Sequence, residues 1–514
     1  MVYSYHLKRA QFKSDSELIN WLQSQFNMIR ESIQRGMIHY FDTFDWRLYR
    51  QGYHLYLLNQ SLYLYQFIKK VVEKEENFQH AFTEILITQE GLIFGKIAQI
   101  IENRALLCRA SLRINNQTYR LLNKDDKTIT RIQVEDCKIK DKSKYNDLGL
   151  YFELYPFRGY ANEIPGILKR FPSSELSACT DDRLKRGLKI IGKIPADYSS
   201  KLQIRLTKGM SALDATKKIF IYLLDHIRIN EKGILEDIDT EFLHDFRVAI
   251  RRSRSALGQF KGVLDEKMVH KMKEYFSLLG RSSNKLRDID VYLLREQQYK
   301  LMVPVELKQY LNRFFQVLKE QREIEYRSII KLIRSAKYKR ILSEWELYLK
   351  SRHVQSSPKM KTVREMAGNV IEKRNKKVLD FGEKILLSGS DDFMHQLRIE
   401  GKKLRYLLEF FQSLFPPEKI LKLINNLKLL QNNLGDINDL IIQQQRLIHS
   451  ARELNPEGRN EKNTALTFGI LIGKLNEKQL IKKKEFAKLF SNYAAPEVQK
   501  IYNEIIYINK GRVG

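Results

Sequence analysis

A histidine-led, arginine-rich segment occurs twice in the chain, with corresponding positions 151 residues apart. The copies read FLHDFRVAIRRSRSALGQF over residues 242–260 and FMHQLRIEGKKLRYLLEFF over residues 393–411. Guanidinium groups hold phosphate oxygens through paired hydrogen bonds, and ammonium groups add point charges. A neutral imidazole can also hydrogen-bond a phosphate oxygen. These residue types predict that both segments bind a phosphate-bearing anion.

Each copy separates into a basic face and an apolar face when it is plotted as a helix at about 100° per residue. The basic face of the first copy contains His244, Arg247, Arg251, Arg252 and Arg254. At the same offsets the second copy has His395, Arg398, Lys402, Lys403 and Arg405. The opposite faces are apolar, as expected for helices that pack against a core.

A basic helix face can also be an ordinary solvated surface. Exposed helices usually mix Glu and Lys in pairs four residues apart, whereas carboxylates are almost absent from these two faces. Crowded like charges repel one another, and a bound anion would relieve that repulsion. The faces lack a second His, Cys or carboxylate at metal-ligand spacing, so we predict no metal site, no cofactor and no catalytic residue here.

The repeat extends beyond the basic segments. NKLRDIDVYL (284–293) aligns with NNLGDINDLI (432–441), which places Asp288 over Asp436 at an offset of 148. Lys271 and Lys419 match at the same offset and are weaker candidates for the binding site. A near-constant offset predicts duplication of a unit of several helices, each unit forming a small antiparallel bundle.

The two parts of the chain that must position these segments have different periodicities. From Ser211 to about residue 508, apolar residues recur with helical spacing, and prolines fall where helices would end. From about 36 to 160 the segments are short, aromatic or β-branched, and often alternate, as is typical of antiparallel strands. Ser14 to about Arg35 predicts a helix behind a Ser/Asp cap.

The charge balance favours an anionic partner. The 514 residues include 90 Lys and Arg against 61 Asp and Glu, a formal charge of +29. Residues 1–200 hold 30 against 23, so most of the excess lies in the helical part. Nucleic acid, an anionic membrane surface and another polyanion all remain compatible with this charge.

The cysteines and the hydropathy bear on location. Cys108, Cys137 and Cys179 are odd in number and lack a CxxC spacing, which predicts neither a disulfide framework nor a cysteine zinc site. No apolar run approaches ~18 residues and the start does not read as a signal peptide, so we predict no membrane span and a cytoplasmic protein. The oligomeric state is left open.

The helical part resembles the CHAD family, the conserved-histidine α-helical domain. DTEFLHDFRVAIRRSRSAL with LRDIDV, and MHQLRIEGKKLRY with LGDINDL, are similar to its two repeats. SAKYKRIL (335–342) and LTFGILIGKL (466–475) also fit, so the resemblance covers about 205–510. It implies two pseudo-symmetric four-helix bundles, over about 209–350 and 360–510, whose basic helices converge on a central groove. It also implies binding of inorganic polyphosphate by the ten residues of the basic faces.

The N-terminal part, residues 1–175, resembles more faintly a CYTH domain, the triphosphate tunnel fold, with residues 176–208 as a connector that contains a short helix. HYFDTFDWRLYRQGYHLYL (39–57) and DDRLKRGLKII (181–191) carry this resemblance. Active members open with an ExExK strand, whereas VYSYHLKR presents Tyr3, Tyr5 and Leu7 on one face and Ser4, His6 and Lys8 on the other. The late acidic strand is reduced to Glu153. We therefore expect an antiparallel, barrel-like α+β domain without triphosphatase activity.

The main hypothesis is therefore a non-enzymatic polyphosphate-binding protein, for which polyphosphate granules are an expected location. One alternative is general polyanion or nucleic-acid binding, which the charge permits although no helix-turn-helix, zinc finger or RNA-recognition signature is present. The other is residual metal-dependent triphosphatase activity in the N-terminal domain. That activity needs several carboxylates and basic groups, and the sequence lacks both sets.

Overall fold

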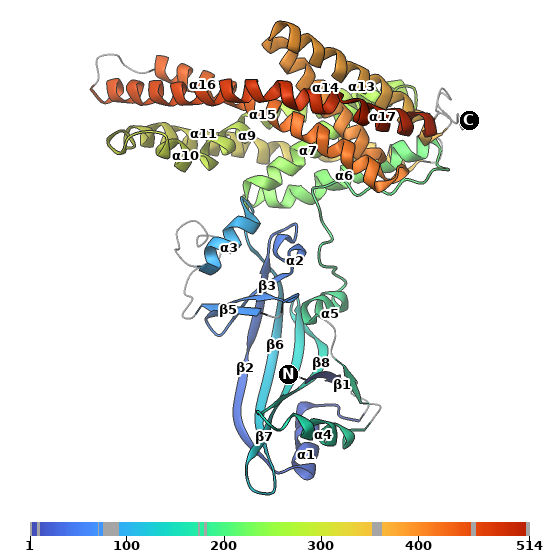
Figure 1. The fold of residues 1–514 in the computed structure, drawn as a ribbon, viewed down its shortest axis with the longest axis vertical. Coiled ribbons are helices and arrows are strands. Elements are labelled where there is room, and N and C mark those ends of the chain that lie inside the picture. The colour runs from blue at the N-terminus through green and yellow to red at the C-terminus, as the bar shows by residue number, and fades with distance from the viewer. Residues whose placement is uncertain are drawn as a thin grey trace. The chain divides into compact units, whose positions relative to one another are not determined.

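Figure 1 shows the chain as a computed structural model. It describes residues 3–7, 11–69, 71–75, 92–172, 175–178, 182–351, 362–453 and 459–509. Lys8 and Cys179 therefore lie outside the described residues. The chain folds as two units, Met1–Ser200 and Lys201–Gly514. The first is built on an antiparallel sheet, and the second is helical.

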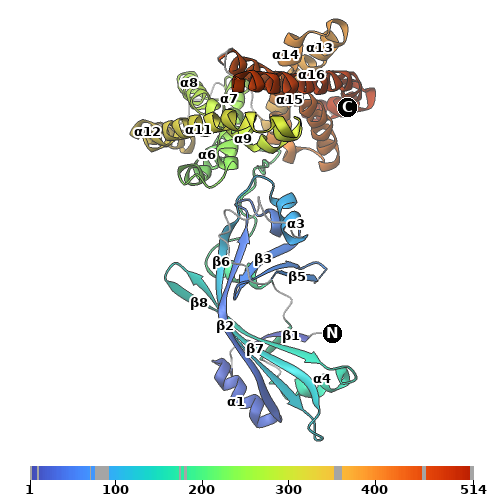
Figure 2. The same ribbon diagram turned by 90° about the vertical axis from the view of Figure 1, so that its left-hand side faces the viewer.

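The N-terminal unit contains a nine-stranded sheet in which all described neighbours are antiparallel. The order across the sheet is β5 (Val71–Glu75), β4 (Ser61–Gln66), β3 (Tyr53–Leu58), β2 (Met28–Asp42), β6 (Leu107–Leu122), β7 (Thr128–Asp141), β8 (Lys144–Pro156), β1 (Tyr3–Leu7) and β9 (Leu176–Ala178). Figure 2 shows its strong twist. Among the described strands, β5 and β9 do not pair with each other, so the sheet has two open edges. The closed barrel stays a prediction.

The helix predicted from Ser14 to about Arg35 is shorter in the structure. Helix α1 spans Asp15–Gln25, and the Ser14 side chain accepts a hydrogen bond from the backbone N–H of Glu17 as predicted. Phe26 is extended, and β2 begins at Met28 and pairs with β6 as far as Asp42. Pairing with a strand distant in sequence overrides the local helical spacing of residues 28–35.

Helices cover both faces of this sheet. On one face α1 and α4 (Ile164–Lys169) pack over a core that includes Tyr119, Val134 and Phe152. On the other face α5 (Arg183–Ile190) packs through Leu184 and Leu188. Short α2 (Arg47–Arg50) and α3 (Leu92–Ile101) pack on β3 and β4. Strand β9 and helix α5, which fall in the predicted connector, thus belong to the N-terminal unit.

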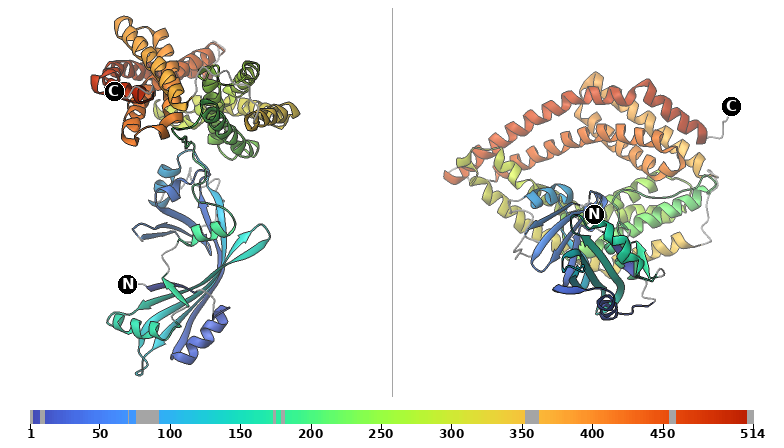
Figure 3. Two further views of the ribbon diagram at one scale, coloured as in Figure 1. Left: turned by 90° about the vertical axis from the view of Figure 1, so that its right-hand side faces the viewer. Right: turned by 60° about the horizontal axis from the view of Figure 1, so that its bottom comes forward.

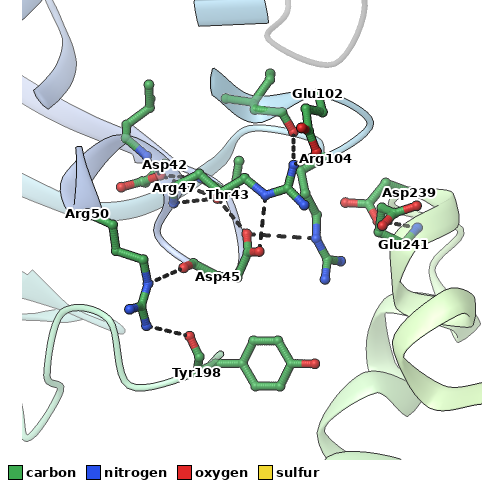
Figure 4. A network of polar contacts seen from close by, with 12 residues as sticks. Asp42, Thr43, Asp45, Arg47, Arg50, Glu102, Arg104, Tyr198, Asp239 and Glu241 are labelled. Carbon is green, nitrogen blue, oxygen red and sulfur yellow. Dashed lines mark hydrogen bonds and ion pairs between the residues drawn. The ribbon is translucent and has the colours of Figure 1, made fainter. Parts of the chain in front are cut away.

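The Asp-Thr turn after β2 is held by a polar network (Figure 4). The Asp42 carboxylate accepts from the backbone N–H groups of Thr43, Leu48 and Tyr49 at 2.7, 3.0 and 2.8 Å. Burial raises the pKa of Asp42 to about 6, although these three bonds oppose the shift. Arg50 donates to the carbonyl oxygen of Tyr198 at 3.1 Å, so the turn also fixes the end of this unit.

The second unit contains twelve described α-helices. The first repeat contains α6 (Ala212–Leu235), α7 (Thr240–Gln259), α8 (Glu266–Ser282), α9 (Asn284–Leu294), α10 (Glu296–Leu301), α11 (Tyr310–Arg334) and α12 (Ala336–Lys350). The second contains α13 (Val363–Ser388), α14 (Asp391–Phe411), α15 (Pro417–Arg452), α16 (Arg459–Ala494) and α17 (Pro496–Asn509). None of the described helices is long and apolar enough to cross a membrane.

The helix boundaries reveal the duplication directly. Helices α6 and α13, α7 and α14, and α8 and α15 each begin 151 residues apart. Helix α15 is continuous where the first repeat breaks into α8, α9 and α10, and it lies beside α16 as a long pair in the right-hand view of Figure 3. The predicted helical duplication is therefore present from α6 to α8 and again from α13 to α15.

The repeats meet in several regions, two of which lie outside the basic helices. The capping residues Ser211 and Thr362, which begin α6 and α13, form an isolated antiparallel bridge, and the Val363 N–H donates to the Met210 carbonyl at 3.1 Å. In the other region, α9, α10 and α11 pack against α15 and α16 in a core that includes Phe315 and Phe468. The N-terminal caps of α6 and α13, which are equivalent helices of the two repeats, thus lie side by side.

Candidate anion-binding site

The two duplicated helices, α7 and α14, contact each other. The ring of Phe260 lies 5.7 Å from that of Phe411, and Gln259 Nε2 donates to the Lys403 carbonyl at 3.5 Å. Arg251 Nε donates to the Tyr406 hydroxyl at 2.7 Å. The bond between Arg251 and Tyr406 shows that this contact also brings part of the two basic faces together.

Four of the predicted residues form a central group, which we call the cation cluster: Arg247, Arg251, Arg398 and Lys402. Burial lowers the pKa of Arg398, and the charge of Arg251 lowers it further. Burial lowers the pKa of Lys402 to about 7, and the charges of Arg398 and Arg251 add to that effect. Cations from both repeats therefore repel one another within the cation cluster.

The centre of the cluster is poorly neutralised. Lys402 is half-buried and has no hydrogen-bond or ion-pair partner among the described residues. The Nε of Arg398 is buried, and no described group accepts a hydrogen bond from it. Desolvated cations without partners are unfavourable, and an anion placed between them would reduce that cost.

Arg247 is anchored more firmly than the other members. Its guanidinium donates to the Gly280 carbonyl at 2.9 Å, to Ser283 Oγ at 2.6 Å and to Asn284 Oδ1 at 2.6 Å. Burial lowers the pKa of Arg247 to about 10, while the charge of Asp288 acts in the opposite direction. The break between α8 and α9 thus holds this side chain in place.

Two carboxylates border the cluster at equivalent positions of the repeats. Asp288 acts electrostatically on Arg247, and Asp439 acts on Arg398. Asp288 and Asp439 are 151 residues apart in the sequence, and so are Arg247 and Arg398. The sequence alignment of Asp288 with Asp436 is therefore wrong. In the structure the residue of the second repeat that corresponds to Asp288 is Asp439. Asp436 instead lies 3.9 Å from Lys482 Nζ.

Asp436 and Asp439 also line a cleft of about 340 Å³ between α10, α15 and α16. Arg295 and Lys478 lie on its wall, and Arg295 approaches Asp439 to 3.9 Å. The cleft thus carries charges of both signs and adjoins the cation cluster through Asp439.

Three other predicted cations are held in ion pairs at the helix crossing. Arg252 is buried, and its Nη2 lies 2.8 Å from Glu409 Oε2. Arg405 Nε lies 3.4 Å from the other oxygen of Glu409. Lys403 Nζ lies 2.6 Å from Glu400 Oε1. The pair between Arg252 and Glu409 joins α7 to α14 and leaves Arg252 with little access to a ligand, whereas the pairs of Arg405 and Lys403 lie within α14.

The remaining predicted residues are not members of the cation cluster. Arg254 is exposed as a whole residue, although partial burial of its guanidinium and the charge of Arg281 lower its pKa. His244 is half-buried and His395 is exposed. Lys271 and Lys419 form ion pairs of 2.6 and 2.8 Å with glutamates of α12 and α17, so they tie helices together within each repeat.

Some residues of the site could not be found from residue types alone. Tyr406 lies on the basic side of its helix by wheel position but carries no charge; it is buried, and its hydroxyl accepts a hydrogen bond from Arg251 of the other repeat. Ser283 and Asn284 gain their role through the fold of α8 onto α7. Arg281 lies in a separate helix with no sequence signal linking it to Arg254.

Comparisons with known proteins address the helical unit. No curated protein matches the chain. A crystal structure of the CHAD domain from the plant Ricinus communis has 21% identity and a TM-score of 0.47, and the match covers 59% of this chain and 96% of that one. PptA from Streptomyces chartreusis has 13% identity and a TM-score of 0.44, over 55% of this chain and 100% of its own. Residues 218–448 match the family model of the CHAD domain, so the chain contains a CHAD domain that includes both duplicated basic helices.

Proposed function

We propose that the helical unit binds inorganic polyphosphate and that it does so without catalysing a reaction. The observation that carries the proposal is the meeting of Arg251, Arg398 and Lys402 from two repeats. None of the three forms an ion pair with a described carboxylate. The presence of a CHAD domain supports the choice of ligand, because CHAD domains are linked in general to polyphosphate binding.

The symmetry of the cluster suits a uniform linear anion. Arg247 and Arg251 occupy the same steps of α7 as Arg398 and Lys402 occupy on α14. A chain of identical phosphates presents the same oxygens to both halves. Arginine can bind these oxygens through two parallel bonds, and lysine adds a point charge.

A competition experiment tests the proposal. Labelled long-chain polyphosphate bound to the full chain would be displaced by unlabelled polyphosphate, double-stranded DNA or RNA at about 150 mM salt, where weak charge-only binding is largely screened. We expect polyphosphate to compete far better at matched phosphate concentration. Equal competition by DNA or RNA would favour the alternative of a general polyanion surface, which the charge of +29 supports.

A charge-reversed variant locates the site. We expect R251E/K402E to lose polyphosphate binding while its helical circular dichroism is retained. The matched control is K271E/K419E, which reverses the same number of charges at peripheral ion pairs. Loss of binding in the control alone would contradict the site assignment.

For the N-terminal unit we propose no triphosphatase activity. The guanidinium of Arg183 lies 2.7 Å from Glu135 and 2.9 Å from Glu153, and it stacks over Tyr151 with 4.4 Å to the ring centroid. The protein's own arginine thus neutralises the carboxylates that a metal-dependent reaction would need. Phosphate release from tripolyphosphate with Mg²⁺ or Mn²⁺ tests this, and we expect none.

We also propose a cytoplasmic location that includes polyphosphate granules. The proposal rests on the ligand and on the cysteine pattern. Fluorescence microscopy of the tagged protein against a polyphosphate stain would test it, and the R251E/K402E variant should fail to concentrate at the granules.

A further inference from the structure

We propose that Lys402 takes up a proton when polyphosphate binds at the cation cluster, so that binding weakens as the pH rises above neutrality. This inference rests on the proposed function. It assigns to one residue a role that the other cations of the cluster cannot share.

The first step is an asymmetry between the repeats. Arg251 and Lys402 occupy the same position of α7 and α14. A guanidinium keeps its proton under all ordinary conditions, whereas an ammonium can release one when its surroundings are unfavourable. The cluster therefore contains one cation that can switch its charge among three arginines that cannot.

The second step is the environment of Lys402. Arg398 and Arg405 face it from its own helix, Arg251 faces it from α7, and Asp439 faces it from α15. Three cations are thus opposed by one carboxylate around a half-buried amine. Arg251 has a hydrogen bond to Tyr406, but Lys402 has no such partner among the described residues.

The neighbouring lysine shows what a partner does. Lys403 is adjacent in sequence, yet its Nζ lies 2.6 Å from Glu400 Oε1. Lys402 lacks a comparable contact, and burial with the nearby arginines lowers its pKa to about 7. Lys402 is therefore the cation of the cluster that releases its proton most readily near neutral pH.

The third step is the effect of the ligand. Phosphate oxygens placed among the cations supply the negative charge that Lys402 lacks, so they favour its protonated form. Above about pH 7 the free protein must then gain up to one proton on binding. By linkage, the affinity should fall by at most about tenfold for each pH unit above that value. Arg247, whose pKa is lowered to about 10, does not contribute near pH 8.

Titration calorimetry on the full chain with inorganic polyphosphate tests the inference at about pH 8, in two buffers that differ in ionisation enthalpy. The difference in heat gives the number of protons taken up. We expect a value approaching one for the natural protein and close to zero for K402R, which keeps the positive charge but cannot release it. The matched control K403R should retain the uptake, because Lys403 already has a carboxylate partner.

The outcomes separate the two proposals. Tight binding with the same heat in both buffers would overturn the role of Lys402 and leave polyphosphate binding intact. Unchanged proton uptake in K402R would overturn it as well, because another group would then be the acceptor. Absence of binding by the natural protein would overturn the proposed function and this inference with it.

Discussion

Arg251 and Tyr406 belong to different repeats, and the 2.7 Å hydrogen bond between Arg251 Nε and the Tyr406 hydroxyl joins the two basic helices where they cross. The bond fixes the direction of the guanidinium without cancelling its charge. Tyr406 is buried and also lies beneath the guanidiniums of Arg252 and Arg405, at 5.6 and 5.7 Å from its ring centroid. One aromatic side chain therefore positions cations from both repeats.

We expect Tyr406→Phe to lower the free energy of unfolding of the helical unit by about 1–2 kcal/mol, because it removes a buried hydrogen bond to a charged group while the ring is kept. Chemical denaturation followed by far-ultraviolet circular dichroism measures this. Polyphosphate affinity should fall less than in R251E/K402E, since every cation remains. The control Tyr145→Phe removes an exposed hydroxyl of the sheet unit and should change stability little. An equal loss in both variants would contradict the role of Tyr406.

Glu409 is the carboxylate on which the crossing depends. It pairs with the buried Arg252 and with Arg405. We expect Glu409→Gln to destabilise the helical unit by about 2–3 kcal/mol, because two guanidiniums lose their counter-charge and one of them is desolvated.

The matched comparison for Glu409→Gln is Asp380→Asn, which breaks the exposed pair between Asp380 and Lys384. That change should cost about 0.5 kcal/mol or less. Thermal unfolding of both variants is the measurement. If Glu409→Gln unfolds at the same temperature as Asp380→Asn, the ion pairs at the crossing do not stabilise it.

Much of the helical unit could be predicted from the sequence, because the spacing of apolar residues and the helix caps depend only on residues near one another in the chain. The period of apolar residues and the capping residue Ser211 predict α6, and the wheel of residues 242–260 predicts which face of α7 is basic. The meeting of α7 with α14 could not be derived from periodicity, because it depends on contacts between residues about 150 positions apart. Only the family resemblance implied it.

The misplaced equivalence of Asp288 with Asp436 has a physical origin. Offsets of 148 and 151 differ by three residues, which is close to one helical turn, so both alignments keep apolar residues on the buried face. The similar triplets LRD and LGD favour the offset of 148. The helix boundaries and the electrostatic effects of Asp288 on Arg247 and of Asp439 on Arg398 indicate that Asp439 is the equivalent residue.

The pH dependence of stability gives a test of Lys402 that needs no ligand. Below about pH 7 this lysine is protonated in the folded and unfolded states. Above that value the folded state releases the proton, while the unfolded chain keeps it up to the ordinary lysine pKa of about 10.4. The unfolded state then binds more protons, so stability should rise with pH by at most about 1.4 kcal/mol per unit.

We expect ligand-free protein to show this rise between about pH 7 and 9 in denaturant unfolding of the helical unit, and we expect Lys402→Gln to remove it. Lys403→Gln serves as the comparison, since that lysine is paired with Glu400. A pH profile that is the same in the natural protein and in Lys402→Gln would mean that the amine stays charged in the folded state.

The salt dependence of polyphosphate binding should count the cations that contact the ligand. Each phosphate-neutralising charge that is removed lowers the slope of log K against log salt concentration by about one unit. We expect Arg398→Gln to reduce the slope in this way, because its guanidinium lies in the cluster without an ion-pair partner among the described residues. Lys271→Gln should leave the slope nearly unchanged, since Lys271 is paired with Glu344 away from the helix crossing. Binding isotherms at several salt concentrations measure both slopes. If the two substitutions lower the slope equally, the ligand is held by the charge of the whole surface and the cluster has no special part in binding.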